Sequence, residues 1–162
     1  MRSQHTVARY GWLVGWVAVG LVMAASASAA PLTVQTFANQ SNADPGDSGA
    51  NIAASALISV LVTNPRNGLP MTNLGPNVGN GTAAITLPSG WALVNGFNVS
   101  PGGCLMTPTE FVNQGNGIYT IRVVPFVTNP ACTWLAGDYH YVIALSGGNN
   151  GRALGVLRIV TR

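Results

Sequence analysis

Apolar and polar positions alternate along most of the chain after residue 31, which is the period of a β-strand whose successive side chains point to opposite faces. β-Branched and aromatic residues, which favour strands, recur in the alternating segments. Clusters of Gly, Pro, Asn and Asp separate the segments and predict turns. The pattern predicts strands at residues 32–37, 56–63, 83–87, 91–99, 104–112 (interrupted at Pro108), 118–124, 139–145 and 154–161.

The segment 139–145 alternates without a break and therefore predicts its own two faces. We expect one face to point into a core, and it carries Tyr139, Tyr141, Ile143 and Leu145. His140 is then expected on the outer side. The same reasoning groups two further sets on single strand faces: Ile58, Val60 and Val62 in one segment, and Tyr119, Ile121 and Val123 in another.

The number and length of these segments predict the fold class. After residue 30 no segment keeps a 3.6-residue apolar period over the length of a helix, although the Ala-rich residues 51–56 could form one helical turn. Seven or eight short strands in ~130 residues predict an all-β protein, an antiparallel β-sandwich. A small closed barrel is the alternative, because patterning does not distinguish the two. No linker divides residues 30–162, so we expect a single domain there.

The first 29 residues have the order of a secretory signal peptide. Residues 1–9 carry two Arg and no acid, residues 10–23 are largely apolar, and small residues follow. Ala27-Ser28-Ala29 fits the small-residue preference of signal peptidase, which predicts cleavage after Ala29. An uncleaved membrane anchor is the alternative, but the apolar run is short for a ~20-residue span. We therefore expect an exported protein, periplasmic or secreted, with no membrane span after cleavage.

Cysteine usage agrees with export. The chain has two cysteines, Cys104 and Cys132, and a pair in an exported protein most often forms a disulfide. A metal or redox role is the alternative, but neither Cys belongs to a C-x-x-C motif and no His or acid lies beside them at ligand spacing. The sequence therefore predicts a Cys104–Cys132 disulfide.

Four segments carry a resemblance to a known family. Residues 62–74 contain a strand, an Asn-Gly turn and a following Pro and Leu, and resemble a strand-turn-strand element of bacterial immunoglobulin-like and macroglobulin-like domains. Residues 117–119, 134–139 and the last strand resemble the final strands of those domains. The resemblance implies an immunoglobulin-like sandwich and no particular activity. Tyr139, which follows Gly-Asp, is similar to the tyrosine corner of such sandwiches. The antibody-type Cys-Trp-Cys spacing is missing, since no Trp lies between the two cysteines.

Composition and charge narrow the function classes. With 48% hydrophobic and only 7% charged residues, the chain is too apolar to be intrinsically disordered. The formal net charge of +3 falls to +1 once the leader with its two Arg is removed. The remaining Arg residues are not clustered, as tracking a phosphate backbone would require, so we expect no nucleic-acid partner.

Residues suited to catalysis are few. After the leader the only His is His140, and Asp138 lies two residues earlier on the same strand face. A His-acid pair also needs a nucleophile and an oxyanion hole, and the chain has no Gly-x-Ser-x-Gly elbow. Four acids in total make a glycosidase carboxylate pair improbable. We therefore expect a non-enzyme, with a small hydrolase centred on His140 as an alternative.

Two other features could bind a metal ion. The loop around Asp44 and Asp47 offers oxygen donors for calcium, but a plain turn is favoured by about nine to one because Asp, Pro and Gly commonly build turns. Met71 and Met106 could bind copper with His140 only if the fold brought them together, and core packing is favoured. We therefore expect no cofactor and no metal.

Two aromatic residues are the best candidates for a ligand surface. Trp91 and Trp134 could stack a sugar or anchor a partner if exposed, but apolar neighbours favour a core position for both. The expected function is a non-catalytic exported module that acts by surface contact, in binding, adhesion or envelope assembly, on an unknown protein or glycan partner. Apart from the hydrolase, the alternative is a pilus-type subunit, which requires an incomplete sandwich.

Overall fold

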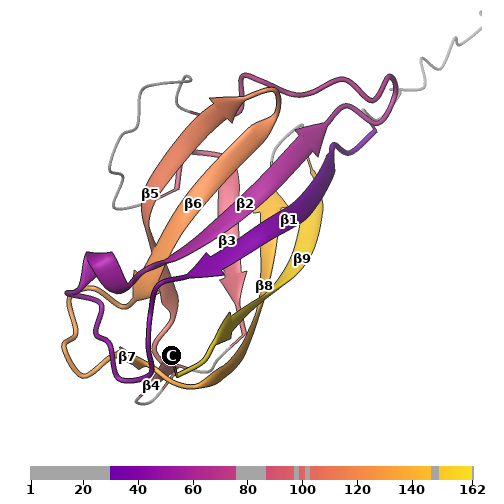
Figure 1. Ribbon diagram of the computed structural model, residues 1–162. Coiled ribbons are helices and arrows are strands. Elements are labelled where there is room, and N and C mark those ends of the chain that lie inside the picture. The colour runs from indigo at the N-terminus through magenta and orange to yellow at the C-terminus, as the bar shows by residue number, and fades with distance from the viewer. Residues whose placement is uncertain (1–29, 76–86, 97–98, 101–102, 147–149, 162) are drawn as a thin grey trace, which may run out of the picture.

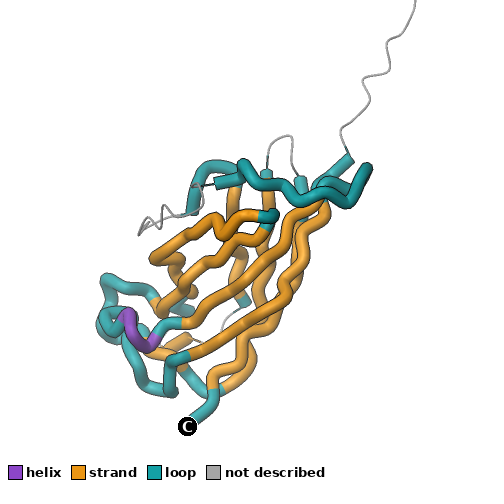
Figure 2. The backbone as a smooth tube through the Cα atoms, turned by 45° about the horizontal axis from the view of Figure 1, so that its top comes forward, coloured by secondary structure: helices purple, strands orange, loops and turns teal. Residues whose placement is uncertain are grey.

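The computed structural model describes residues 30–75, 87–96, 99–100, 103–146 and 150–161. They form two antiparallel sheets packed as layers, and loops gather at the ends of the strands (Figures 1 and 2). The elements are β1 (Thr33–Ser41), the 3₁₀ turn η1 (Ile52–Ala54), β2 (Ala56–Thr63), β3 (Trp91–Asn95), β4 (Val99–Ser100), β5 (Met106–Gly115), β6 (Ile118–Pro125), β7 (Thr133–Trp134), β8 (Gly137–Leu145) and β9 (Arg152–Ile159).

The strand order is that of an immunoglobulin constant-type sandwich. The four-stranded sheet has the order β1-β2-β6-β5 and the three-stranded sheet the order β3-β8-β9, which correspond to the A-B-E-D and C-F-G sheets of that fold. A two-stranded pair, β4 and β7, lies beside them. The immunoglobulin-like β-sandwich predicted from the sequence is confirmed, and the closed-barrel alternative is wrong because the described strands form separate sheets.

Most strand predictions match the structure. The segment 56–63 is β2 with the same bounds, and Pro108 lies at a register shift in β5, as the interruption there predicted. The segment 91–99 is instead divided into β3 and β4, and β1 continues to Ser41, beyond the predicted end at residue 37. Residues 83–86 of the expected strand 83–87 lie outside the described part of the chain.

The alternating apolar faces meet between the two sheets, as predicted. Tyr139, Tyr141, Ile143 and Leu145 are buried, and His140 is exposed on the opposite side of β8. The other predicted sets are also fully buried: Ile58, Val60 and Val62 on β2, and Tyr119, Ile121 and Val123 on β6. Gly155 on β9 faces Tyr141, and a Cβ there would overlap the tyrosine ring. The ring thus occupies the space that the glycine leaves.

Side-chain hydrogen bonds close the two open sides of the sandwich. On one side β1 lies along β9, where Thr36 Oγ1 donates to the Leu154 carbonyl oxygen at 2.9 Å and the Tyr141 hydroxyl donates to Asn39 Oδ1. On the other side Asn95 Nδ2 of β3 donates to the Met106 carbonyl oxygen of β5 at 3.2 Å. These contacts tie edge strands of one sheet to edge strands of the other.

Tyr139 fixes the entry into β8. Its hydroxyl donates to the Leu135 carbonyl oxygen at 2.9 Å and accepts from the Leu135 amide at 2.8 Å. β8 holds the place of strand F, at whose start the tyrosine corner of immunoglobulin folds occurs. The expected bond of the hydroxyl to a nearby backbone group is therefore present.

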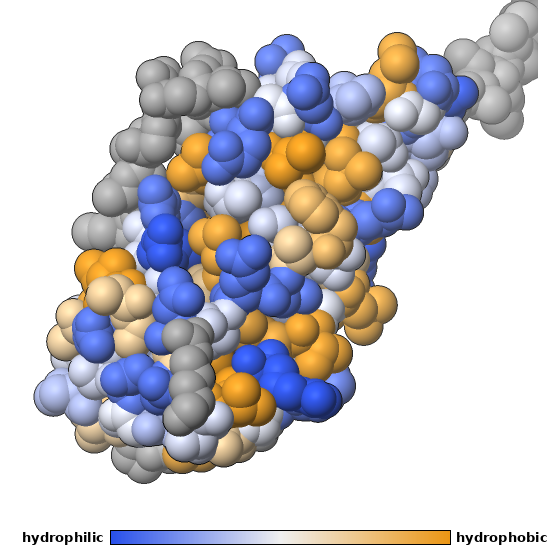
Figure 3. Space-filling view, viewed as in Figure 1, coloured by the Kyte–Doolittle hydropathy of each residue, from blue (hydrophilic) through white to orange (hydrophobic). Residues whose placement is uncertain are grey.

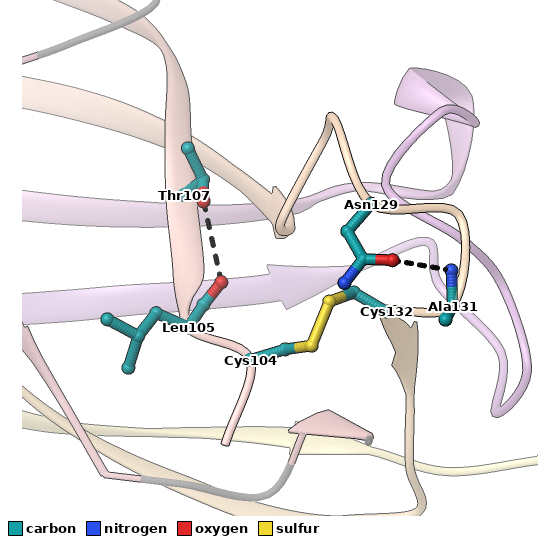
Figure 4. Close-up of a disulfide and its surroundings, with 6 residues drawn as sticks. All are labelled: Cys104, Leu105, Thr107, Asn129, Ala131 and Cys132. Atoms are coloured by element: carbon teal, nitrogen blue, oxygen red, sulfur yellow. Dashed lines mark hydrogen bonds between the residues drawn. A yellow bond between two sulfur atoms is a disulfide. The ribbon is translucent and has the colours of Figure 1, made fainter. Parts of the chain in front are cut away.

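The predicted disulfide is confirmed. Cys104 and Cys132 are joined with a Cα–Cα distance of 5.9 Å (Figure 4). The bond ties the residues just before β5 to the connection between β6 and β7. In antibody domains the disulfide instead joins strands B and F across the core, and here the matching strands β2 and β8 meet through apolar side chains.

The expected signal peptide, residues 1–29, lies outside the described part of the chain. Among the described residues no helix has the length and apolar character needed to span a bilayer.

Candidate functional site

The outer surface of the three-stranded sheet exposes several large apolar side chains to solvent. We call it the β3–β8–β9 face. In Figure 1 this sheet lies behind the four-stranded sheet, so the face points away from the viewer. Strand alternation places these side chains on it: Ala92 and Val94 from β3, Asp138, His140, Val142 and Ala144 from β8, and Arg152, Leu154, Val156 and Arg158 from β9.

Large apolar side chains on this face are open to solvent. Leu154 is 81% exposed, Val94 56% and Val156 43%. Among the described residues the only other large apolar side chain exposed within a strand is Phe37 on β1. A solvated sheet face ordinarily carries polar side chains, so three exposed aliphatic residues set this face apart.

The strand register gathers these residues into one stripe. Val94 pairs with Val142, and Val142 pairs with Leu154, so the three form a row across the sheet. In the next row Gly96 donates its amide hydrogen to the His140 carbonyl oxygen, and His140 pairs with Val156. A shallow depression of about 320 Å³, lined by Gly96, His140 and Val156 among others, lies over this part of the face.

Charged groups border the stripe at its two ends. Arg152 lies at one end, in the row of Ala92 and Ala144. At the other end the Arg158 guanidinium donates two hydrogen bonds to Asp138, from Nε to Oδ1 at 2.6 Å and from Nη2 to Oδ2 at 2.8 Å. These bonds from Arg158 lower the pKa of Asp138. The pair stays charged at neutral pH and leaves that end of the face electrically balanced.

The outer face of the four-stranded sheet is different in character. There Arg122 Nε binds Glu110 Oε2 at 2.7 Å, and Arg122 Nη1 donates to Ser55 Oγ at 2.8 Å. Gln114 Nε2 donates to Thr120 Oγ1 at 3.1 Å. Figure 3 shows hydrophilic side chains spread among the apolar ones on this side of the molecule. This face therefore has the polar network that the β3–β8–β9 face lacks at its centre.

Trp91 and Trp134 do not form a ligand surface. The exposed fraction of Trp91 is 8% and that of Trp134 is 0%. The indole nitrogen of Trp91 donates to the Leu74 carbonyl oxygen, and that of Trp134 donates to the Ala54 carbonyl oxygen at 3.1 Å. Both side chains therefore lie in the core, the position that their apolar neighbours favoured, rather than on the surface.

Asp138, the acid of the predicted His140–Asp138 pair, is bound by Arg158. His140 and Asp138 share one face as predicted, but both carboxylate oxygens of Asp138 accept hydrogen bonds from Arg158. A catalytic His needs its acid to orient the imidazole. The depression beside His140 is shallow and lined mainly by Val94, Val142, Leu154 and Val156, which offer no nucleophile.

The metal hypotheses find little support in the described residues. The Asp44 loop is a turn closed by its own groups, since Asp47 Oδ2 accepts from the Asp44 amide at 2.8 Å. Met71 bonds through its backbone to β2 near the start of β6, whereas Met106 pairs with Pro125 at the end of β6. The two Met residues thus lie at opposite ends of a strand, and the described part of the chain holds no group of three His, Cys, Asp or Glu able to bind a metal.

Sequence reasoning predicted the last strand but missed the face it contributes. β9 carries apolar residues on both of its faces: Ala153 and Leu157 are buried, and Leu154 and Val156 are exposed. Apolar residues on both faces of a strand are typical of a strand covered on both sides. Here one side has no cover from the described residues, and the doubly apolar pattern is the signal that could have indicated it.

Comparison with known proteins adds no family to this description. The chain matches no protein-family model, and neither the curated proteins nor the solved structures include a significant match. The resemblance to bacterial immunoglobulin-like and macroglobulin-like domains stays a prediction.

Proposed function

We propose that the protein is an exported, non-catalytic β-sandwich module that acts by surface contact through the β3–β8–β9 face. The observation that carries the proposal is the 81% exposure of Leu154, in one row of the sheet with the exposed Val94. Covering such aliphatic groups gains about 25 cal/mol per Å² of apolar area removed from water. A flat apolar stripe with charged ends is suited to binding another macromolecule, since it has no deep pocket for a small substrate.

A pilus-type subunit is less well supported by the same geometry. In that class a partner's strand completes a sandwich that lacks one of its own. Here β9 takes the place of the last strand and pairs with β8 over eight residue pairs, from Gly137↔Ile159 to Ala144↔Arg152. The chain therefore supplies the strand that a donor would have to provide.

Photo-crosslinking in cells that export the protein tests the proposal. A benzophenone amino acid replaces Leu154 in one variant and Leu69 in the other. Leu69 is a matched control, because it is a leucine 60% exposed in the turn after β2, away from the β3–β8–β9 face. We expect a discrete crosslinked product from position 154 and none from position 69. Crosslinking that is equal at both positions, or that is missing at 154, would contradict a contact function for this face.

A further inference from the structure

The register of the three strands makes the β3–β8–β9 face complementary to itself. In each of three rows the residue on the β3 side, from β3 itself or directly after it, is smaller than the β9 residue. The rows pair Ala92 with Arg152, Val94 with Leu154, and Gly96 with Val156, with Ala144, Val142 and His140 of β8 between them. A surface with small groups along one edge and large groups along the other fits a copy of itself that is turned by 180° about the middle strand.

We propose that the β3–β8–β9 face binds a second copy of this chain around a two-fold axis that runs along β8. The inference rests on the proposed function, since it names the partner of the same face. Around this axis β9 of each copy lies over β3 of the other. Leu154 packs against the partner's Val94, and Val156 enters the depression at the partner's Gly96. Val142 lies near the axis and meets its own counterpart.

The charges of the face agree with this axis. Asp138 is on β8, close to the axis, and Arg158 is one strand away on β9. The rotation brings the partner's Arg158 to the other side of Asp138, so two acids and two arginines form a neutral group. Arg152 lies over the partner's Ala92 at the rim, where its guanidinium reaches water. No charge of the described face is buried without an opposite charge.

The size of the face sets the strength of the contact. The three strands have five, nine and eight residues. With about 4.8 Å between strands and a mean length of about seven residues at about 3.3 Å each, the footprint is roughly 300 Å². Stable complexes bury about 800 Å² on each partner. We therefore expect a reversible dimer whose population rises with protein concentration. Two sheets packed face to face, with their strands about 30° apart, are an ordinary arrangement in β-sandwiches.

Sedimentation velocity of the exported protein, measured from about 1 µM to about 1 mM, tests this dimer. The two-fold axis gives the dimer two equivalent contacts between Leu154 and Val94. Leu154→Asp or Val94→Lys places a charge against an apolar side chain at both of them, so we expect either variant alone to be monomeric. An equimolar mixture should form a heterodimer, because one contact then pairs Asp with Lys and the other keeps native Val94 against Leu154. Leu69→Asp should dimerise as the unmodified protein does.

Each outcome is decisive when circular dichroism shows that the variants are folded. A mixture that stays monomeric contradicts the axis, and dimerisation of Leu154→Asp contradicts the face. If the unmodified protein is monomeric at about 1 mM while position 154 still crosslinks to another macromolecule, the second copy is wrong and the contact function stands. If it is monomeric and position 154 does not crosslink, both proposals fail.

Discussion

Ile143 and His140 lie three residues apart on β8 and face opposite sides of the sheet. Ile143 is fully buried between the two layers, and His140 is exposed. The same strand therefore carries residues whose loss should have different consequences for folding.

We expect Ile143→Ala to lower the free energy of unfolding by roughly 2–5 kcal/mol, because it leaves a cavity that the packed layers cannot fill. His140→Ala should change it by no more than about 0.5 kcal/mol, since an exposed side chain makes few contacts in the monomer. Urea unfolding of dilute protein measures both values. A larger loss from His140→Ala would mean that the two faces of β8 are assigned the wrong way round.

Tyr141 makes the free energy of unfolding depend on pH. Burial raises the pKa of Tyr141 to about 12, against hydrogen bonds with Asn39 and Thr36 that lower it. The pKa of an unfolded tyrosine is about 10. The folded state therefore favours the neutral hydroxyl, and the stability this provides is complete below pH ~10 and is lost as the pH rises through ~12.

We expect the free energy of unfolding to fall as the pH rises from about 10 to about 12, and the fall to be smaller in Tyr141→Phe. Burial also raises the pKa of Tyr119 and Tyr139, so part of the fall should persist in the variant. Urea unfolding at several alkaline pH values provides the measurement. An identical pH dependence in Tyr141→Phe would show that this hydroxyl does not ionise on unfolding.

At the scale of elements, the disulfide joins two connections between strands. Cys104 precedes β5, and Cys132 lies in the segment between β6 and β7, with 28 residues separating them. Cys132 is fully buried, and Trp134 just beyond it packs edge-to-face on Tyr139 with ring centroids 5.1 Å apart. The bond thus anchors the chain shortly before the β8 tyrosine corner.

Replacing both cysteines by serine should lower the free energy of unfolding by about 3–4 kcal/mol, because the unfolded chain gains the freedom of an open loop. The melting temperature of reduced native protein should fall in the same way. Differential scanning calorimetry of both samples gives the values. Two free thiols in protein recovered from the exporting cell would contradict the disulfide itself.

At the scale of the whole molecule, the domain is expected to be separate from its leader. β1 begins at Thr33, which pairs with Thr63 of β2. Cleavage after Ala29 would therefore leave every described strand intact.

We expect the exported protein to begin at Ala30 or within a few residues of it, because the small-residue site follows the apolar run directly. N-terminal sequencing of the exported material checks the position. A protein that still begins at Met1 would contradict the signal peptide and favour the membrane-anchor alternative.

The sequence by itself determined where most strands lie and which way their side chains point. This information is local, because neighbouring residues in a strand face opposite sides whatever else the chain does. Tyr139 and Ile143 could therefore be assigned to the core from their spacing alone. The disulfide was also predictable, since only two cysteines were present to pair. The extension of β1 to Ser41 was missed because its polar residues are held in the strand by pairing with β2, which is not a local property.

Only the tertiary structure decided which faces are covered. Trp91 and Trp134 have the chemistry of a ligand surface, and their burial depends on segments far away, such as the carbonyl groups of Leu74 and Ala54 that accept their indole hydrogens. Leu154 is as apolar as a core residue, yet it is exposed. The core lies on only one side of β9, and the alternate residues of that strand face it. Local alternation separates two faces but does not say what lies against each one, and that depends on how distant strands pack.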